Sequence, residues 1–310
     1  MGKKPIYAIV GPTASGKTAL GVELALAIGG EIINCDSVQI YRQIEIATAK
    51  PTEEEKRGVP HHLIDYIPPG VKYTAASWAN DAAATIYEIE SRGKIAILVG
   101  GTGFYLRTLR RPLFESPKTD DMLREKLKKI KENRGAEYLH RVLRKIDPTS
   151  ADKLFPRDYI RVIRALEVYF QTGVPLSGQQ ENRPPLPEFA ERIKMFVLNP
   201  QRDLLYEKIN RRTETHFENG LVDEVKLLRR QGLKETSNAL GSHGYRRVCE
   251  YLRGERDLES AIEQTKQDVR NYAKRQLTWF RREQDAEWLN GFGGDPQVLK
   301  ELLRIVRIAG

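Results

Sequence analysis

Residues 11–18 read GPTASGKT, directly after the apolar run Ile6–Val10 and directly before a helix-like stretch at 19–28. The octapeptide fits the pattern G-x-x-x-x-G-K-[ST], in the strand, glycine-rich loop and helix context of a phosphate-binding loop. Gly11 and Gly16 let the backbone turn tightly, so that its N–H groups converge on an anion at a helix N-terminus. A glycine-rich turn without a ligand is the alternative, and the complete eight-residue match argues against it.

Three further apolar segments, at 31–35, 95–99 and 193–199, alternate with helical patterns. This alternation predicts an α/β fold, a P-loop NTPase-like parallel sheet flanked by helices. Between proline-marked borders, residues 118–187 show helical periodicity and no convincing strand pattern. We therefore expect a core at 1–117, an all-helical insertion domain at 118–187, and the rest of the core at 188–310, mostly helical after the strand at 193–199.

The composition is that of a globular protein, because 40% of the 310 residues are apolar and 30% are charged. No apolar run approaches the length of roughly 18 residues that a membrane helix needs. The first five residues lead straight into a strand pattern, so we expect no signal peptide and a cytoplasmic location. Two cysteines without a histidine cluster indicate neither a disulfide framework nor a zinc site. The net charge of +9 favours a polyanionic partner, and nothing indicates a membrane or protein partner.

The residues around the loop indicate its chemistry. Lys17 is placed to reach the terminal phosphate, and the Thr18 hydroxyl is placed to ligate Mg²⁺. The strand at 95–99 is followed by glycines, whereas a kinase or NTPase has a metal-binding Asp there. The best acidic candidate is Asp36, at the carboxyl edge of the strand at 31–35, where it suits a general base. A helix cap or turn is the alternative role for Asp36.

Seven motifs, in order along the chain, resemble those of the bacterial tRNA dimethylallyltransferases. They are GPTASGKT (11–18), DSVQIYR (36–42), TAKPTEEE (48–55), VPHHLID (59–65), LVGGTGFYL (98–106), RVIRALEVY (161–169) and AKRQLTWFR (273–281). The resemblance implies transfer of a dimethylallyl group from dimethylallyl diphosphate to the exocyclic amine of the adenosine 3′ of the anticodon, with release of diphosphate. The implied partners are the tRNA anticodon stem-loop and dimethylallyl diphosphate, with Mg²⁺ as cofactor.

By this resemblance, Asp36 is the general base, and Lys17 and Arg212 complete the catalytic set. Arg211 is adjacent, but on a helix it points about 100° away from Arg212. The implied diphosphate ligands are Arg212 and the loop residues Gly11, Pro12, Thr13, Ala14, Ser15, Gly16, Lys17 and Thr18. The implied tRNA-side residues are Asp36, Ser37, Val38, Gln39, Thr102, Arg124, Arg161, Arg164, Gly244, Tyr245, Arg246, Lys274, Arg275, Gln276, Trp279 and Arg281.

The chemistry agrees with these roles. An adenine amine is a poor nucleophile, so removing its proton during attack helps. The leaving diphosphate gathers negative charge, which backbone amides, Lys17, Mg²⁺ and Arg212 are suited to stabilise. Two departures from the family pattern, His243 in GSHGYRR and the stretch IEIATAKP (44–51), leave these residues untouched.

Basic segments are suited to the RNA backbone. Residues 118–167 carry 14 Lys and Arg against 9 Asp and Glu, and residues 266–282 carry 6 against 1. Their spacing predicts that Arg157, Arg161 and Arg164 share one helix face and that Lys266, Arg270 and Lys274 share another. A solvated charged face is the alternative for each.

Three other functions remain open at this point. An adenylate isopentenyltransferase performs the same chemistry on a free nucleotide and needs neither basic segment. A small-molecule kinase transfers a phosphoryl group from ATP. A P-loop RNA-binding factor binds RNA without transferring anything.

Overall fold

The computed structural model describes residues 3–114, 117–181 and 183–308, and the chain divides into two compact units. The first, here called the core unit, comprises residues 1–110 and 187–310, and the second, the helical unit, comprises residues 111–186. The sequence pattern placed the borders of the insertion at 118 and 187. In the structure, the helical unit instead begins at Arg111, in the proline-containing segment before the first predicted insertion helix, and it ends at Leu186.

The core unit is built on a six-stranded sheet in which every neighbouring pair is parallel, in the order β3-β2-β4-β1-β5-β6. The predicted α/β fold with a parallel sheet is confirmed. The strands are β1 (Ile6–Val10), β2 (Gly30–Asn34), β3 (His61–His62), β4 (Ile95–Gly100), β5 (Ile193–Leu198) and β6 (Ala286–Leu289). The chain after β5 is mostly helical, as predicted, but it also contains the strand β6, which the sequence pattern did not indicate. A four-residue strand at a sheet edge has too little periodicity to stand out, and its pairing with β5 defines it.

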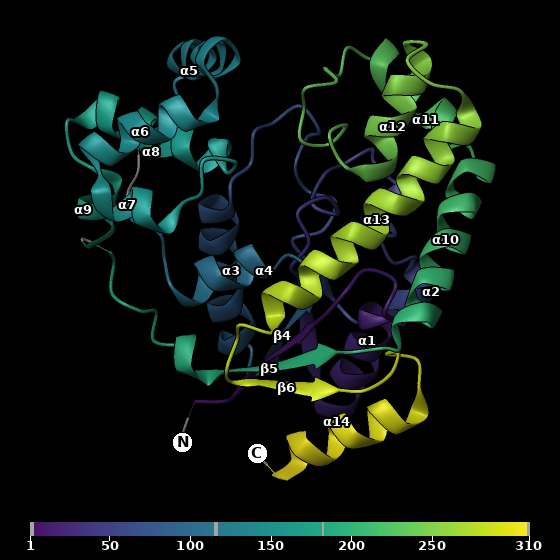
Figure 1. Ribbon diagram of the computed structural model, residues 1–310. Coiled ribbons are helices and arrows are strands. Elements are labelled where there is room, and N and C mark those ends of the chain that lie inside the picture. The colour runs from purple at the N-terminus through teal and green to yellow at the C-terminus, as the bar shows by residue number, and fades with distance from the viewer. Residues whose placement is uncertain (1–2, 115–116, 182, 309–310) are drawn as a thin grey trace. The chain divides into compact units, whose positions relative to one another are not determined.

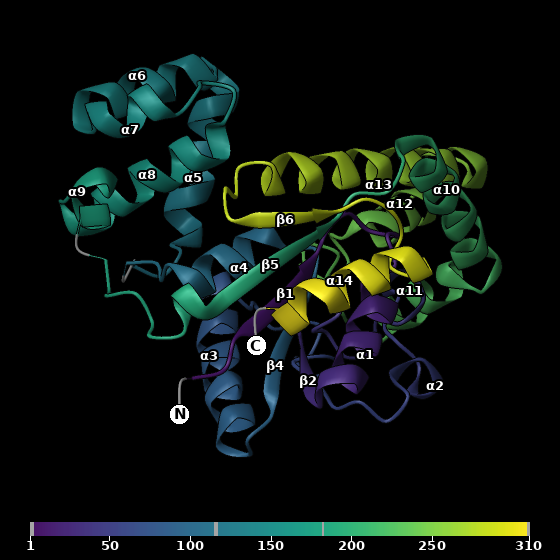
Figure 2. The same ribbon diagram turned by 90° about the horizontal axis from the view of Figure 1, so that it is seen from below.

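The residues of β1 alternate between the two faces of the sheet, as a strand requires. Ile6, Ala8 and Val10 pack with α3 (Ala75–Ser91) and α4 (Gly103–Arg110) on one face. Tyr7 and Ile9 pack with α1 (Lys17–Ile28) and α14 (Pro296–Ile308) on the other face, and Figure 2 shows these two layers on either side of the strands. Burying both faces leaves the carboxyl ends of the strands as the edge open to ligands.

Five further core elements follow the carboxyl ends of strands: η1 (Ile46–Thr48), α10 (Arg202–Glu218), α11 (Leu221–Arg230), α12 (His243–Leu252) and α13 (Leu258–Phe280). The short helix η2 (Ala190–Arg192) directly precedes β5 at the amino ends of the strands, and α2 (Glu53–Lys56) packs against α1. The long helix α13 packs against both α10 and α12, and Figure 1 shows it crossing above the sheet. Asp257 caps α13 by accepting a hydrogen bond from the Ser260 N–H. Helices α10 and α13 bring residues that are distant in the sequence to the loops after β1 and β4.

The described part of the helical unit contains helices and no strand, as predicted. They are α5 (Asp121–Arg134), α6 (Ala136–Ile146), α7 (Pro148–Lys153), α8 (Tyr159–Thr172) and α9 (Leu176–Glu181). Their apolar faces form a separate core that includes Leu127, Leu143 and Leu166. Across residues 3–114, 117–181 and 183–308, every helix is too short or too polar to cross a membrane.

Candidate active site

The loop that follows β1 leads directly into α1 and has the backbone geometry that an anion site requires. Gly16 precedes α1 with φ of +86°, and a Cβ at Gly16 would lie 3.0 Å from the backbone nitrogen of Gly293. Ala14 adopts φ of +63°, which is uncommon for a residue with a side chain. No side chain of the described residues caps α1 at Gly16. The first N–H groups of α1 therefore stay available to an anion, as a phosphate loop requires.

Lys17 places its charge inside this loop. Its Nζ donates to the carbonyl oxygen of Pro12 at 2.7 Å. Burial lowers the pKa of Lys17 to about 8, while the charge of Asp36 raises it and that of Arg212 lowers it. An anion bound in the loop would favour the ammonium form. Thr18 lines the same cavity, and its hydroxyl has no hydrogen-bond partner among the described residues.

Arg212 reaches the loop from α10. Its Nη2 donates to the Thr13 hydroxyl at 2.5 Å. Burial lowers the pKa of the guanidinium, and the charge of Asp36 opposes this shift. The neighbouring Arg211 is exposed, in agreement with the predicted difference between the two arginines. The loop and Arg212 thus bring two cations and a row of N–H groups to one cavity.

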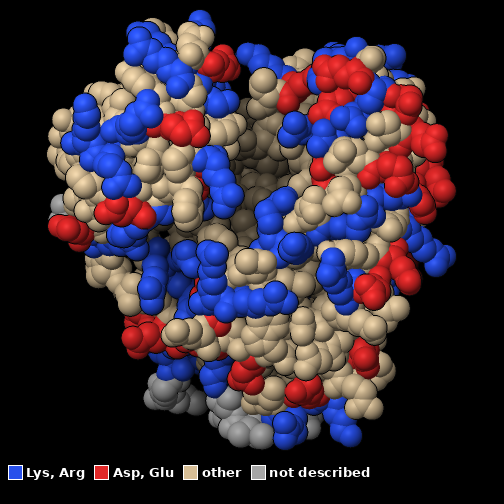
Figure 3. All heavy atoms as spheres, in the orientation of Figure 1, with Lys and Arg blue, Asp and Glu red and all other residues tan. Residues whose placement is uncertain are grey.

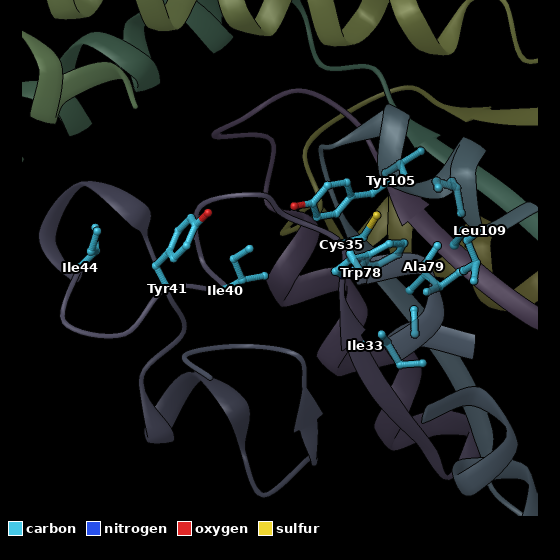
Figure 4. Packing of buried hydrophobic residues seen from close by; sticks show 14 of the residues in the cluster. Ile33, Cys35, Ile40, Tyr41, Ile44, Trp78, Ala79, Tyr105 and Leu109 are labelled. Carbon is cyan, nitrogen blue, oxygen red and sulfur yellow. The ribbon is translucent and has the colours of Figure 1, made fainter. Parts of the chain in front are cut away.

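Asp36 lies two residues after β2, at the carboxyl edge of the sheet. Its Oδ1 accepts from the backbone N–H groups of Val38, at 2.8 Å, and Gln39, at 3.3 Å, so the carboxylate also forms a turn. Its Oδ2 has no hydrogen-bond partner among the described residues. The adjacent Cys35 is buried in the same cluster as Trp78 and Tyr105, whose rings stack with centroids 4.8 Å apart (Figure 4). This packing holds one carboxylate oxygen in place and leaves the other accessible.

Two cavities meet at these residues. The first, of about 480 Å³, is lined by the phosphate loop among other residues, and the second, here called the aromatic cavity, has about 460 Å³ and seven Tyr and Phe residues among those that line it. Both volumes suit small organic ligands. The aromatic residues of the second cavity are Tyr41, Tyr73, Phe104, Tyr105, Phe217, Tyr245 and Tyr272. The residues that line both cavities are Thr13, Asp36, Thr48 and Arg212.

The remaining core-unit residues of the predicted tRNA side have different environments. Ser37, Val38 and Gly244 line the second cavity, and Gln39 lines the first. The Thr102 hydroxyl accepts from the Ser37 N–H at 3.1 Å. The exposed residues of the set are Arg246, Lys274, Arg275 and Arg281.

Three other residues of this set are engaged inside the protein. The Tyr245 hydroxyl donates to Glu224 at 2.8 Å, and the Trp279 ring lies 4.5 Å below the guanidinium of Arg107. Gln276 is buried, and its amide binds backbone groups of two loops. Their side chains therefore already have protein partners.

Among the predicted tRNA-side arginines of the helical unit, some form ion pairs with a buried carboxylate and one is largely exposed. Arg124 and Arg164 both form ion pairs with Glu167, which is fully buried. Arg161 is 69% exposed and contacts Asp158 at 3.3 Å. The prediction that Arg157 shares their helix face is wrong, because α8 begins at Tyr159, after Pro156 and Asp158. Of Arg157, Arg161 and Arg164, only Arg161 both belongs to α8 and is largely exposed.

Sequence reasoning missed several residues of the second cavity. His216 lines it one helical turn after Arg212, and burial lowers the pKa of its imidazole to about 4. Tyr272 lines it one turn before Gln276. The spacing of four residues from a predicted site residue on a helix is a signal that could have found both.

Together, the parallel sheet, the phosphate loop and the carboxylate facing it define a P-loop α/β enzyme. The IPP transferase family model matches residues 39–283. The chain is 45% identical to the tRNA dimethylallyltransferase of Koribacter versatilis over 97% of this chain and 98% of that relative. The chain therefore belongs to the IPP transferase family, and the resemblance predicted from its motifs is confirmed.

Solved structures agree with this assignment. The full-length tRNA isopentenylpyrophosphate transferase of Bacillus halodurans superposes with a TM-score of 0.71 at 39% identity, covering 99% of this chain and 96% of that one. A eukaryotic dimethylallyltransferase described as acting on tRNA superposes with a TM-score of 0.78 at 28% identity, covering 99% of this chain and 78% of that one. The fold therefore extends over essentially the whole chain.

Proposed function

We propose that this protein transfers a dimethylallyl group from dimethylallyl diphosphate to the exocyclic amine of the adenosine 3′ of the anticodon in tRNA, releasing diphosphate. One observation carries the proposal: Asp36 and Arg212 line both the phosphate-loop cavity and the aromatic cavity. A donor held in the first cavity and a base held in the second would meet at these side chains. The names of the relatives support the same reaction.

The first cavity suits the donor's diphosphate. The N–H groups at the start of α1, Lys17 and Arg212 would surround the phosphates and stabilise the charge that gathers on them as the bond to the allyl carbon breaks. The hydrogen bond from Arg212 to the Thr13 hydroxyl holds the guanidinium toward the loop. The apolar residues Val22, Ile32 and Val99 also line this cavity.

The residues of the first cavity also fit Mg²⁺. The described residues contain no cluster of three or more His, Cys, Asp or Glu side chains suited to a metal. Mg²⁺ needs few protein ligands when it is bound together with a phosphorylated substrate, because the phosphates and water supply the rest. The unpaired Thr18 hydroxyl would therefore hold it beside the donor. The ion would supply charge neutralisation of the leaving diphosphate.

The second cavity suits an adenine that has left the base stack. Its aromatic walls offer faces on which a base can stack, as in other enzymes that extrude a nucleotide before reaction. Asp36 Oδ2 would accept the proton of the exocyclic amine as its nitrogen attacks the allyl carbon. Oδ1 stays bound to the N–H groups of Val38 and Gln39, so the carboxylate keeps its orientation.

The tRNA backbone would contact exposed basic side chains. Arg161 and the α13 residues Lys274 and Arg275 are exposed, and Figure 3 shows Lys and Arg side chains spread over the visible face of the helical unit. Such groups replace counterions around phosphates, so this part of the affinity depends on salt. A cytoplasmic location belongs to the same proposal, since it would place the enzyme with its tRNA.

Mass spectrometry of tRNA nucleosides tests the function after incubation of the protein with Mg²⁺, tRNA and dimethylallyl diphosphate. We expect one adenosine per anticodon loop to gain a dimethylallyl group. Modification of AMP in preference to tRNA would instead indicate an adenylate isopentenyltransferase. Phosphoryl transfer from ATP without prenyl transfer would indicate a kinase, and binding of tRNA without any product would indicate a binding factor.

A further inference from the structure

Gln276 is placed differently from the exposed residues around it on α13. Its side chain is 5% exposed, whereas Lys274 and Arg275 are exposed to solvent. Its Oε1 accepts from the Thr13 N–H at 2.8 Å, and its Nε2 donates to the Gly101 carbonyl oxygen at 2.9 Å. Gln276 therefore connects the loop after β1 with the loop after β4, and it also lines the first cavity.

The surrounding backbone leaves space for this amide. A Cβ at Gly101 would lie 2.1 Å from Gln276 Nε2, so only glycine allows the contact. A Cβ at Gly103 would lie 2.2 Å from the ring of Trp279, one helical turn along α13. Both glycines follow β4, and both let this end of α13 approach the sheet closely. Gln276 and Trp279 of α13 thus lie directly against the chain that follows β4.

The amide completes a chain of contacts that reaches the phosphate site. Gln276 binds the N–H of Thr13, and the hydroxyl of the same Thr13 accepts from Arg212. We propose that Gln276 is a positioning residue, which sets the phosphate loop and Arg212 for the diphosphate and does not contact RNA. This inference rests on the proposed function only in taking the first cavity as the diphosphate site.

A carboxamide suits this role because it offers one acceptor and one donor. Leucine would leave the Thr13 N–H and the Gly101 carbonyl without partners in a buried place, which is costly. A glutamate at this position, when ionised, can still accept from Thr13 but faces the Gly101 carbonyl with no proton to donate. When protonated, it offers the same donor and acceptor as glutamine. Burial raises the pKa of a carboxyl, so this protonation falls in an accessible pH range.

The test measures binding of inorganic diphosphate with Mg²⁺ by calorimetry and of tRNA by filter retention, on the full chain. We expect Gln276→Leu to weaken diphosphate binding about tenfold to a hundredfold, with tRNA affinity within about twofold of wild type. Lys274→Ala, two residues away on α13, should instead weaken tRNA binding and leave diphosphate binding close to that of the wild type. Gln267→Leu, on an exposed part of α13, is the control and should match the wild type for diphosphate.

The glutamate variant distinguishes positioning from general loss of structure. Relative to wild type at the same pH, Gln276→Glu should bind diphosphate weakly near about pH 8 and recover toward about pH 5, while Gln276→Leu should not recover. The recovery of diphosphate binding by Gln276→Glu in acid tests the positioning role even if Gln276→Leu folds poorly. Wild-type diphosphate affinity in Gln276→Leu, or a Gln276→Glu variant that does not recover in acid, would overturn the inference. Diphosphate binding by a wild-type protein that transfers no prenyl group would instead count against the proposed function.

Discussion

Arg212 on α10 donates to the hydroxyl of Thr13 in the phosphate loop at 2.5 Å, across 199 positions of sequence. The contact brings a partly buried guanidinium to the first cavity. It also means that the helices beyond the sheet take part in shaping the phosphate site.

Removing the carboxylate of Asp36 should abolish most of the transfer. Asp36→Ala removes the proposed proton acceptor, and a general base typically contributes about 10²–10⁴-fold to the rate. Single-turnover transfer at saturating substrates measures this loss. Asp36→Asn is the matched variant, since its amide oxygen can still accept from Val38 and Gln39 but cannot take the proton. An Asp36→Asn enzyme with wild-type turnover would contradict the assignment.

Replacing Arg212 should slow transfer by roughly 10²–10³-fold, because a preorganised charge beside the leaving group is lost. Arg211→Ala is the control, since Arg211 is the adjacent arginine and is exposed. Thr13→Val should have a smaller effect, because it loosens Arg212 without removing its charge. Equal rates for Arg212→Ala and Arg211→Ala would show that this helix does not stabilise the leaving diphosphate.

Binding of diphosphate should weaken as the pH rises through about 8. Burial lowers the pKa of Lys17 from 10.5 to about 8 in the free protein, so the lysine is charged below that pH and neutral above it. The bound anion favours the charged form, and its affinity therefore falls where free Lys17 loses its proton. Calorimetry across this range measures the decline. Lys17→Arg should remove it, since arginine keeps its charge, and a decline unchanged in Lys17→Arg would assign it to another group.

The two α8 arginines should behave differently when each is replaced by alanine. Arg161→Ala should weaken tRNA binding and leave thermal stability unchanged. The slope of log tRNA affinity against log salt concentration should become shallower by about one unit. Arg164→Ala removes one of two arginine partners of the buried Glu167 and a hydrogen bond to the Pro117 carbonyl, so we expect a loss of about 1–3 kcal/mol in stability. Thermal unfolding and tRNA titrations at several salt concentrations measure both effects. Identical results for the two variants would contradict this division of roles.

Features encoded by neighbouring residues could be predicted from the sequence. The phosphate loop, its flanking strand and helix, and the helical unit all depend on short-range geometry and periodicity, which a sequence displays directly. The position of Asp36 at the carboxyl edge also follows from the strand that precedes it. The choice of Arg212 over Arg211 depended on the family motif together with the angular step of a helix.

Only the tertiary structure decided how these parts meet. The strand β6 is defined by its pairing with β5. The buried Glu167 engages Arg124 and Arg164 in ion pairs inside the helical unit. Gln276 stands in a basic motif, yet its amide binds Thr13 and Gly101, 263 and 175 positions away. A buried polar group must find its partner wherever the fold brings one, and residue type alone does not show which partner that is. The sequence therefore determined the chemistry available to this protein, while packing of α10 and α13 onto the strand ends decided which groups share a site.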